Sequence, residues 1–278
     1  MHRYTRLRNA GIKPAKRKAY QTTFVVCRKI RRKRKLWNHS CRQENTGQDL
    51  YPAVASKLMA ETETPYRPVR IAFRIGYLGE GFFGSQFQPR HRTVEGEIRN
   101  ACIRAGLFSG SPDGRLAISG RTDRGVHARC QVLAFSTPLP DRAIRAFPGQ
   151  LPPDIWATHY CLVPDSYSPR RDVISRTYRY IFTDQPGDLS LMEDAARLFP
   201  GRHDFSCFSK VEAGKTPMRT VSRLEVHADG GCWWLEITAQ SYLWHMVRGI
   251  ATVLLRASYG QQTQEEIAAM LEGPCRNR

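Results

Sequence analysis

The sequence predicts an α+β fold made of two halves with a similar order of elements. Two segments, 69–75 and 176–182, alternate apolar and polar residues, which is the two-residue period of a half-buried strand. Helical periodicity and turn residues separate such strands, as in the segment 94–105. With 278 residues, of which 41% are hydrophobic, the chain can form one large domain or two of ordinary size.

In the first half we expect a strand over 69–75, followed by a helix with Thr93 as its N-cap. Glu95 and Glu97 lie in the first turn of this helix, and Gly106 can end it. The remaining elements are strands over 116–118 and 130–136, a helix over 141–147 and a strand over 156–162. This order is typical of a split β-α-β sandwich, the ferredoxin-like or RRM-like fold.

The second half has a similar order. We expect strands over 176–182, 221–227 and 232–239, and helices over 189–199, 243–258 and 265–271. The segment 201–208 is predicted to be a loop, and Asp229, Gly230 and Gly231 to form a hairpin turn. We divide the chain into an extension (1–66), an N-terminal half (67–165) and a C-terminal half (166–278).

The charge of the chain indicates a polyanionic partner. Lys and Arg number 43 against 25 Asp and Glu, a formal net charge of +18. Residues 1–64 hold 16 basic and 4 acidic residues, a net of +12, whereas residues 65–278 hold 27 and 21, a net of +6. Two thirds of the excess therefore lie in the first quarter of the chain.

The extension is interpreted as basic and disordered, because 28–35 is a like-charge block and apolar residues near it follow no regular period. Four interpretations remain open: an RNA-binding arm, a targeting segment, a zinc-free module, or a stretch upstream of a native start at Met59. We favour the last, because 59–64 directly precede the first convincing strand. Peptides from upstream of Met59 in the native protein would refute it.

Neither a metal site nor a disulfide framework is expected. The 8 cysteines are scattered singly, without a C-x-x-C pair or a His at ligand spacing. Such cysteines are typical of small buried side chains in a reducing cytosol. No apolar stretch approaches the roughly 20 residues that cross a bilayer.

A glycine pattern between 76 and 89 could indicate a dinucleotide site. Gly79, Gly81 and Gly84 match G-x-G-x-x-G, which binds a pyrophosphate only where it opens a helix. Here the chain runs to Pro89 without helical periodicity, and aromatic residues fill the loop. A nicotinamide or flavin site is therefore disfavoured.

The most informative motif is segment 119–128, which reads Ser-Gly-Arg-Thr-Asp-Arg-Gly-Val-His-Ala. Its two glycines allow close backbone approach. Asp123 lies between Arg121 and Arg124, which keep it ionised, so it can act as a nucleophile or electrostatic stabiliser. A surface turn with an internal ion pair is the alternative. The stretch 120–128 resembles the GRTDxGVHA signature of the TruA-type tRNA pseudouridine synthases.

Further segments are similar to motifs of that family. The opening Y-D-G-x-x-[FY]-x-G-x-Q-x-Q is matched over 77–88, with Leu78 in place of the usual aspartate. The segment 176–180 matches R-x-Y-x-Y, and 245–249 resembles the F-x-x-x-M-V-R helix. Segment 201–208 is also similar to a family segment, which we interpret as structural. From the residues alone, Tyr178 could equally be a core tyrosine and Arg248 a snorkelling arginine.

The resemblance implies a set of site residues. Asp123 would be the catalytic carboxylate, Arg248 its ion-pair partner, and Tyr178 the residue that lies against the target base and can help to remove its C5 proton. The substrate-binding candidates are Arg121, Tyr178, Arg176, Arg124 and His127. Arg121 would fill the gap left by the flipped base, and His127 is expected mainly to order the loop.

The resemblance also implies the reaction. Uridine becomes pseudouridine in the anticodon stem-loop of tRNA, at positions 38, 39 and 40, without cofactor or metal: the N1 glycosidic bond breaks, the uracil turns, and it rejoins through C5. Asp123 would attack the ribose or the base, or start glycal formation; these routes stay open. The family further implies a cytoplasmic homodimer, with an extended antiparallel sheet, helices on one face and a basic central cleft.

The resemblance covers residues 69–272 and has departures. Gln150 replaces the usual asparagine, and the chain ends without the family's final segment A-x-x-A-P-x-x-G-L-x-L-x-x-V, which includes a strand lining the cleft. We therefore expect a truncated C-terminal half with an incomplete sheet. The alternative function is a catalytically impaired RNA-binding or RNA-folding relative.

Overall fold

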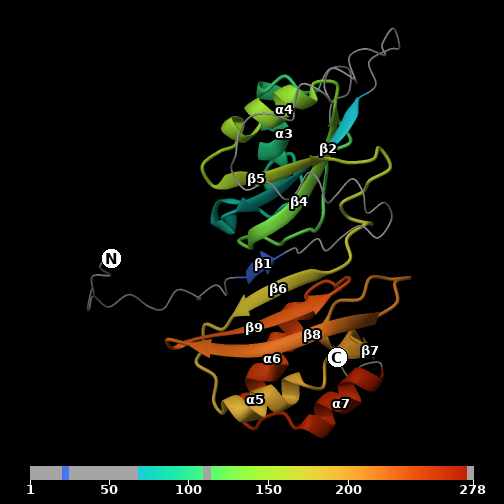
Figure 1. Ribbon diagram of the computed structural model, residues 1–278. Coiled ribbons are helices and arrows are strands. Elements are labelled where there is room, and N and C mark those ends of the chain that lie inside the picture. Colours follow the sequence, from blue (N-terminus) through green and yellow to red (C-terminus); the bar gives the residue numbers. More distant parts are fainter. Residues whose placement is uncertain (1–20, 25–67, 109–113, 274–278) are drawn as a thin grey trace, which may run out of the picture.

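The computed structural model describes residues 21–24, 68–108 and 114–273. Over these residues the chain has the predicted α+β fold, with five α-helices and two four-stranded antiparallel sheets that the short strand β1 joins into one nine-stranded sheet. In Figure 1, the strands cross the middle of the molecule, α3 and α4 lie at one end, and α5, α6 and α7 lie at the other.

The elements of the N-terminal half are β2 (Val69–Tyr77), η1 (Gly79–Gly81), α3 (Val94–Arg104), β3 (Ala117–Ile118), β4 (His127–Thr137), α4 (Pro140–Ala146), η2 (Pro148–Gln150) and β5 (Ile155–Leu162). Those of the C-terminal half are β6 (Arg176–Ile181), α5 (Leu189–Ala196), β7 (Gly201–Asp204), η3 (Ser206–Phe208), β8 (Met218–Asp229), β9 (Cys232–Ala239), α6 (Met246–Ser258) and α7 (Gln264–Glu272).

The strand β1 (Gln21–Phe24) joins the two sheets. The hydrogen-bonded order is β5-β2-β4-β1-β6-β9-β8-β7, with β3 paired to β4. β1 runs parallel to β4, with Thr22 opposite His127, and antiparallel to β6, with Thr23 opposite Tyr178. Figure 1 shows this short strand between the two halves. It therefore lies between the strand that leaves the 119–128 motif and the strand that carries Tyr178.

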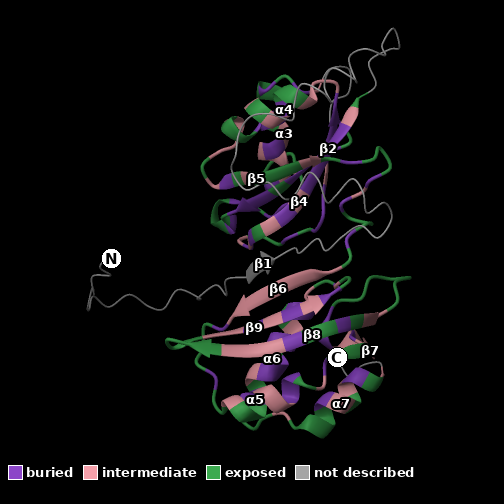
Figure 2. Cartoon of the chain, in the orientation of Figure 1, coloured by how far each residue is buried: buried purple, intermediate pink, exposed green. Residues whose placement is uncertain are grey.

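The N-terminal core lies between one face of β2 and β4 and the helices α3 and α4. Phe73 packs against Phe135 at 5.7 Å and Phe147 at 5.0 Å between ring centroids, and all three are buried. The predicted N-cap is confirmed, because the Thr93 side chain accepts a hydrogen bond from Gly96. Buried residues concentrate on these strands in Figure 2. A rigid sheet thus supports the loop that connects β3 to β4.

The C-terminal core lies between β6, β8 and β9 and the three helices α5, α6 and α7. The apolar stripe of α6 includes Ile250 and Leu254, and both are fully buried with Leu235 and Ile237 of β9. Since successive residues of a strand point to opposite faces, Tyr178 and Tyr180 pack on this helix side. Tyr178 therefore shares a face of the sheet with α6.

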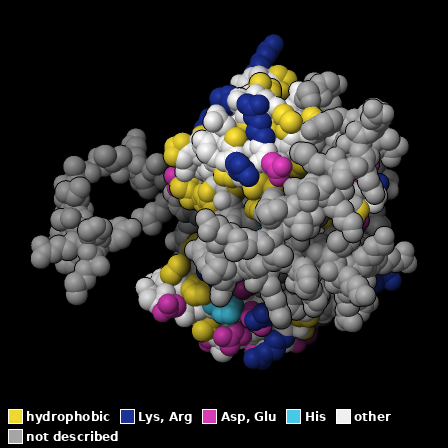
Figure 3. All heavy atoms as spheres, turned by 45° about the horizontal axis from the view of Figure 1, so that its top comes forward, with side chains coloured by type: hydrophobic (Ala, Val, Ile, Leu, Met, Phe, Trp, Pro, Cys, Tyr) yellow, Lys and Arg dark blue, Asp and Glu magenta, His cyan; other side chains and the backbone are white. Residues whose placement is uncertain are grey.

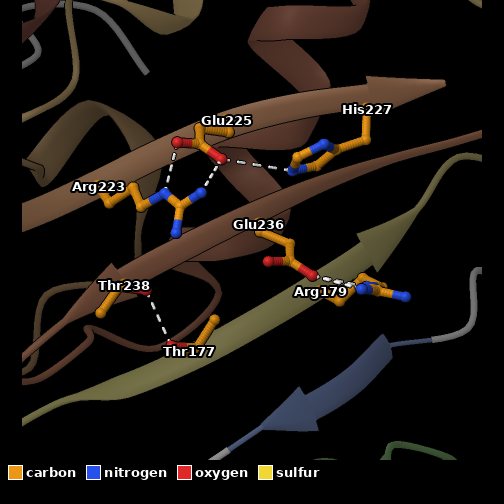
Figure 4. Close-up of polar contacts among 7 residues, drawn as sticks. All are labelled: Thr177, Arg179, Arg223, Glu225, His227, Glu236 and Thr238. Carbon is orange, nitrogen blue, oxygen red and sulfur yellow. Dashed lines mark hydrogen bonds and ion pairs between the residues drawn. The ribbon is translucent and has the colours of Figure 1, made fainter.

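The opposite face of this sheet carries polar pairs (Figure 4). Thr177 and Thr238 are joined by a hydrogen bond of 2.8 Å between their hydroxyls, and Arg179 donates from Nε to Glu236 Oε1 at 2.9 Å. On β8, Glu225 pairs with Arg223 and lies 3.6 Å from Nε2 of His227. Tyr178 lies on the other face of the same sheet, with the helices.

Three features differ from the sequence predictions. The segment 201–208 is not a loop throughout, because Gly201–Asp204 form β7 against β8. The helix predicted to start at residue 243 begins at Met246, since His245 has a φ of +65° and lies outside the helix. No strand was predicted in the extension, yet Gln21–Phe24 form β1; the rest of the extension and the chain end after residue 273 lie outside the described residues.

The last helix provides a test of local stability. Thr263 and Glu266 form a capping box, in which Glu266 N donates to Thr263 Oγ1 at 3.2 Å and Thr263 N donates to Glu266 Oε2 at 2.9 Å. Replacement of Thr263 by alanine should lower the free energy of unfolding by about 1 kcal/mol, measured by urea denaturation. Thr263→Ser should retain most of the capping contribution, and Gln264→Ala should change the free energy of unfolding little. An equal loss in the serine variant would contradict the capping role.

Candidate active site

The signature loop, residues 119–126, connects β3 to β4 and is held by the loop that follows β2. The Tyr77 hydroxyl and Thr122 Oγ1 are 2.8 Å apart and buried. Ser85 accepts from the Thr122 amide at 2.8 Å and donates its own amide to the Thr122 carbonyl at 3.0 Å. The side chain, amide and carbonyl of Thr122 are all bonded, which fixes the residue before Asp123 in place.

Two glycines allow the loop after β2 to approach the signature loop closely. A Cβ on Gly79 would lie 2.0 Å from the carbonyl oxygen of Val126, and one on Gly84 would lie 2.8 Å from that of Thr122. Gly84 also has a φ of +98°, which favours glycine. The G-x-G-x-x-G pattern is thus explained by close packing of two loops. Gly79 and Gly81 lie in a three-residue 3-10 helix, and α3 begins only at Val94, so the pattern does not open a dinucleotide-binding helix.

The base of the signature loop is fixed by Gln131 of β4. Ser119 Oγ donates to Gln131 Oε1 at 2.6 Å, and Gln131 Nε2 donates to the Gly120 carbonyl at 3.2 Å. Both Ser119 and Gln131 are buried. The loop is therefore anchored at its base and, through Thr122, immediately before the aspartate.

Arg176 connects the loop to the C-terminal half. Its guanidinium donates to the Ser119 carbonyl at 2.7 and 3.2 Å, to the Gln240 carbonyl at 2.6 Å and to the Arg170 carbonyl at 3.1 Å. These four bonds use most of the five N–H donors of the guanidinium. The geometry therefore favours positioning of the loop by Arg176 over the substrate contact expected from the sequence.

Asp123 and Arg248 form the ion pair that the sequence analysis expected. Arg248 Nη2 lies 3.7 Å from Asp123 Oδ2, and the two side chains are 51% and 50% exposed. Ion pairs at such exposed positions contribute about 0–1 kcal/mol to stability. Solvent exposure leaves the carboxylate accessible to a substrate, so the pair orients Asp123 more than it stabilises the fold.

The start of α6 brings Arg248 to this position. Arg248 lies in the first turn, where the partial positive charge of the helix N-terminus favours a nearby carboxylate. A Cβ on Gly249 would lie 2.0 Å from the Phe208 carbonyl oxygen, so α6 is pressed against η3 at this point. Buried Met246 and Val247 fix the same turn in the core. The arginine is thus held by a well-packed helix end.

Tyr178 packs edge-on against Tyr242, with ring centroids 4.7 Å apart. The single hydrogen of the Tyr242 hydroxyl is shared between the carbonyls of Arg176 and Ile237, whose oxygens lie at 2.9 and 2.8 Å, which fixes its ring. Burial raises the pKa of the Tyr178 hydroxyl; Arg176 opposes this shift and the neighbouring Asp123 carboxylate adds to it. Tyr178 therefore remains a neutral phenol near the carboxylate.

The other predicted residues surround Asp123 in different ways. Arg121 is exposed, and its charge reaches Glu212, a residue of the loop 209–216 after η3. Arg124 lies over the Phe83 ring at 4.2 Å. His127 Nδ1 accepts a hydrogen bond from the Gly79 amide at 3.4 Å, a contact that orders the loop. The structure thus brings Asp123, Arg248 and Tyr178 together, with Arg121 and Arg124 at the surface.

Three supporting residues were missed as site residues: Tyr77, Ser85 and Tyr242. Tyr77 matches the opening motif, and Tyr242 stands at the aromatic position of F-x-x-x-M-V-R, so both carried a signal in the sequence. Ser85 carried none, because its bonds to Thr122 join residues far apart in the chain. Such long-range backbone contacts have no local pattern.

Within the described residues, no group of three or more His, Cys, Asp or Glu side chains is arranged to hold a metal ion. In the same part of the chain, no helix has the length and apolar character that a membrane crossing requires.

The family model and the relatives described below carry the same description. A family model described as tRNA pseudouridine synthase matches residues 195–278. The tRNA pseudouridine synthase A of Methanosphaerula palustris is 49% identical over 208 residues, 75% of this chain and 74% of that protein. The one from Methanoculleus marisnigri is 46% identical over 210 residues, 76% of this chain and 77% of that protein. The one from Methanocorpusculum labreanum is 43% identical over 207 residues, with coverages of 74% and 73%.

Proposed function

The chain belongs to the tRNA pseudouridine synthase family and is an isomerase that acts on tRNA uridine, and we propose that its targets are positions 38, 39 and 40 of the anticodon stem-loop, with Asp123 as the catalytic carboxylate. The observation that carries the proposal is the accessible Asp123–Arg248 pair at the N-terminus of α6. A uridine that has left the base stack can reach this carboxylate from solvent.

Asp123 supplies the reactive carboxylate in each of the possible routes. It attacks the ribose or the base, or removes the proton that starts glycal formation. Arg248 and the first turn of α6 keep the carboxylate charged and aimed. The bonds to Thr122 hold the backbone before Asp123, so little reorganisation is needed when the substrate arrives.

Tyr178 contacts the uracil as a neutral phenol. Because its pKa is raised, it is protonated at neutral pH and can pack against the base or donate a hydrogen bond. Removal of the C5 proton would require the phenolate, which burial disfavours. We therefore assign Tyr178 to binding of the detached uracil and leave proton removal to Asp123 or solvent.

The basic side chains around the site bind the RNA backbone. Arg121 fills the space left by the flipped uridine, and Arg124, stacked on Phe83, offers its guanidinium to a phosphate. Arginine side chains lie among hydrophobic ones on the described surface of the N-terminal half (Figure 3). His127 orders the loop and borders the same site.

The finer features implied by the resemblance are part of the proposal. We propose that each half is RRM-like, that a basic cleft lies between them, and that the protein is a cytoplasmic homodimer. The order of elements in each half supports the RRM-like assignment, and the position of the ion pair where β4 and β6 approach each other through β1 supports the cleft. The cytoplasmic homodimer rests on the family resemblance.

Arg176 should affect the chemistry of the site rather than the binding of phosphate. Arg176→Gln removes the bonds to Ser119, Gln240 and Arg170, so it should lower the free energy of unfolding by about 2 kcal/mol and slow the single-turnover reaction. The salt dependence of tRNA binding should not change.

Arg179→Gln is the matched control, because Arg179 lies on the same strand but faces the other side of the sheet. A decrease of about 1 in the slope of log K against log salt for Arg176→Gln, without loss of stability, would assign Arg176 to a phosphate instead.

The proposal is tested with tRNA that carries tritium at C5 of uridine, since pseudouridine formation releases this label. Release is expected, and it should cease when the uridines at positions 38, 39 and 40 are replaced by cytidine. Replacement of uridines elsewhere in the tRNA is the control. Release that persists without those three uridines would contradict the proposed target. Binding without any release would favour the RNA-binding relative.

A further inference from the structure

Trp244 exposes its indole where its chain neighbours are buried. Its side chain is 52% exposed, whereas Leu243 and Met246 have exposures of 8% and 0% in the C-terminal core. His245, the N-cap of α6, has a φ of +65°, a conformation that is unfavourable for a non-glycine residue. The backbone before α6 thus directs a large aromatic side chain outward, between two residues anchored in the core.

Trp244 stands just before the helix that carries the ion-pair arginine. It precedes Arg248 by four residues, with the N-cap His245 and the first residues of α6 between them, and Arg248 contacts Asp123. A hydrogen bond of 2.8 Å from the Lys210 amide to the Trp244 carbonyl joins the Trp244 segment to the loop 209–216. Trp244 is therefore connected to the C-terminal side of the ion pair through the start of α6, and to the loop 209–216 through Lys210.

A cation covers part of the indole. Lys210 Nζ lies 5.1 Å from the centre of the ring, and the His245 ring lies at 4.7 Å, tilted by 51°. The charge of Arg121 in the signature loop also acts on Glu212 of this loop: the pKa of the Glu212 carboxyl is lowered chiefly by its hydrogen bond to Lys215, and Arg121 adds to the effect. Aromatic and basic side chains are thus combined within one surface at the site.

This combination suits a nucleobase beside a phosphate. Single-stranded nucleotides bind where bases stack on aromatic rings and cations contact the backbone, and each stacked base contributes about 1–3 kcal/mol. Flipping of the target uridine also leaves its neighbours unstacked and in need of a surface. We propose that Trp244 stacks on a nucleobase adjacent to the target uridine, with Lys210 close to its phosphate. The inference rests on the proposed function and extends it by a specific substrate contact.

Binding of an anticodon stem-loop RNA measures the effect. The assay is fluorescence anisotropy of labelled RNA in the Asp123→Asn background, so that no turnover interferes. Trp244→Ala should weaken binding about 5- to 150-fold, the range that corresponds to 1–3 kcal/mol. Trp244→Phe keeps an aromatic face and should recover most of the affinity. Tyr259→Ala is the control, because Tyr259 is 50% exposed at the opposite end of α6.

A base analogue identifies the contact directly. RNA with 2-aminopurine next to the target uridine should lose fluorescence on binding to the wild-type protein and to Trp244→Phe, but not to Trp244→Ala. Equal quenching by all three proteins, or an alanine variant with wild-type affinity and an unchanged melting temperature, would overturn the inference. So would sedimentation showing that Trp244→Ala breaks a dimer, since the indole would then contact a second copy.

The failure of this inference can be told apart from that of the proposed function. Tritium release from wild-type protein together with unchanged binding by Trp244→Ala would remove only the stacking contact. Absence of release together with weakened binding by Trp244→Ala would retain the contact and remove the proposed reaction.

Discussion

Replacement of Asp123 by asparagine is expected to abolish tritium release, with a loss of about 10⁴-fold or more in the single-turnover rate. Asparagine has nearly the same shape but cannot act as a carboxylate nucleophile or base. The side chain is half exposed, and its ion pair contributes little to stability. The melting temperature should therefore stay close to that of the wild type, so that the loss reports on the reaction alone.

Binding of tRNA should be kept by the Asp123→Asn variant or become tighter, because a negative charge near the RNA phosphates has been removed. Asp229→Asn is the matched control, since Asp229 is exposed at the end of β8, where it pairs with Cys232 of β9. An Asp123→Asn protein that is folded, binds tRNA and releases tritium within tenfold of the wild-type rate would show that another group performs the reaction.

The secondary-structure elements that the sequence predicted well are those with a clear alternation of apolar and polar residues or a clear helix N-cap. The strand predicted over 69–75 became β2, which extends two residues further to Tyr77, and the strand 232–239 became β9 with the expected bounds, because alternation of side chains matches one buried face. The helix after Thr93 was confirmed with its N-cap, since a threonine before two acidic residues satisfies the free amides of a first turn.

The elements that were missed depend on partners distant in the chain. β7 forms because Gly201–Asp204 pair with β8, although their residue pattern resembles a loop. β1 forms because β4 and β6 each present a free edge, whose backbone groups pair with a strand of almost any sequence. The start of α6 moved to Met246 because His245 takes a left-handed conformation, which no periodicity indicates.

The sequence predicted the charged pair of the candidate site but not the hydrogen bonds that hold the surrounding loops in place. The pairing of Asp123 with Arg248 followed from a family resemblance, and the structure contains it. Arg176 was expected to bind substrate, yet its guanidinium holds backbone carbonyls of both halves. The distinction could not be made from sequence, because an arginine next to tyrosines on a strand has the same pattern in either role.

Replacement of Arg248 by glutamine is expected to slow the single-turnover reaction by about 10²–10³-fold, the loss typical of one preorganised electrostatic partner. In the native protein the Arg248 guanidinium lies 3.7 Å from the Asp123 carboxylate. Glutamine preserves much of the side-chain length but carries no charge to orient that carboxylate. Arg248→Lys should recover part of the rate, because it restores the charge without the planar guanidinium. Arg256→Gln, at the exposed far end of α6, should leave the rate unchanged.

A double-mutant comparison separates positioning by Arg248 from direct contact with RNA. If Arg248 acts through Asp123, the Asp123→Asn and Arg248→Gln changes together should cost no more in rate than Asp123→Asn alone, because the interaction is already lost. The affinity of Arg248→Gln for tRNA should also remain within threefold of the wild type. A rate loss that adds to that of Asp123→Asn, or a tenfold loss of affinity, would place Arg248 on the substrate. Its charge would then serve the RNA backbone, and the first turn of α6 would be left to orient the carboxylate.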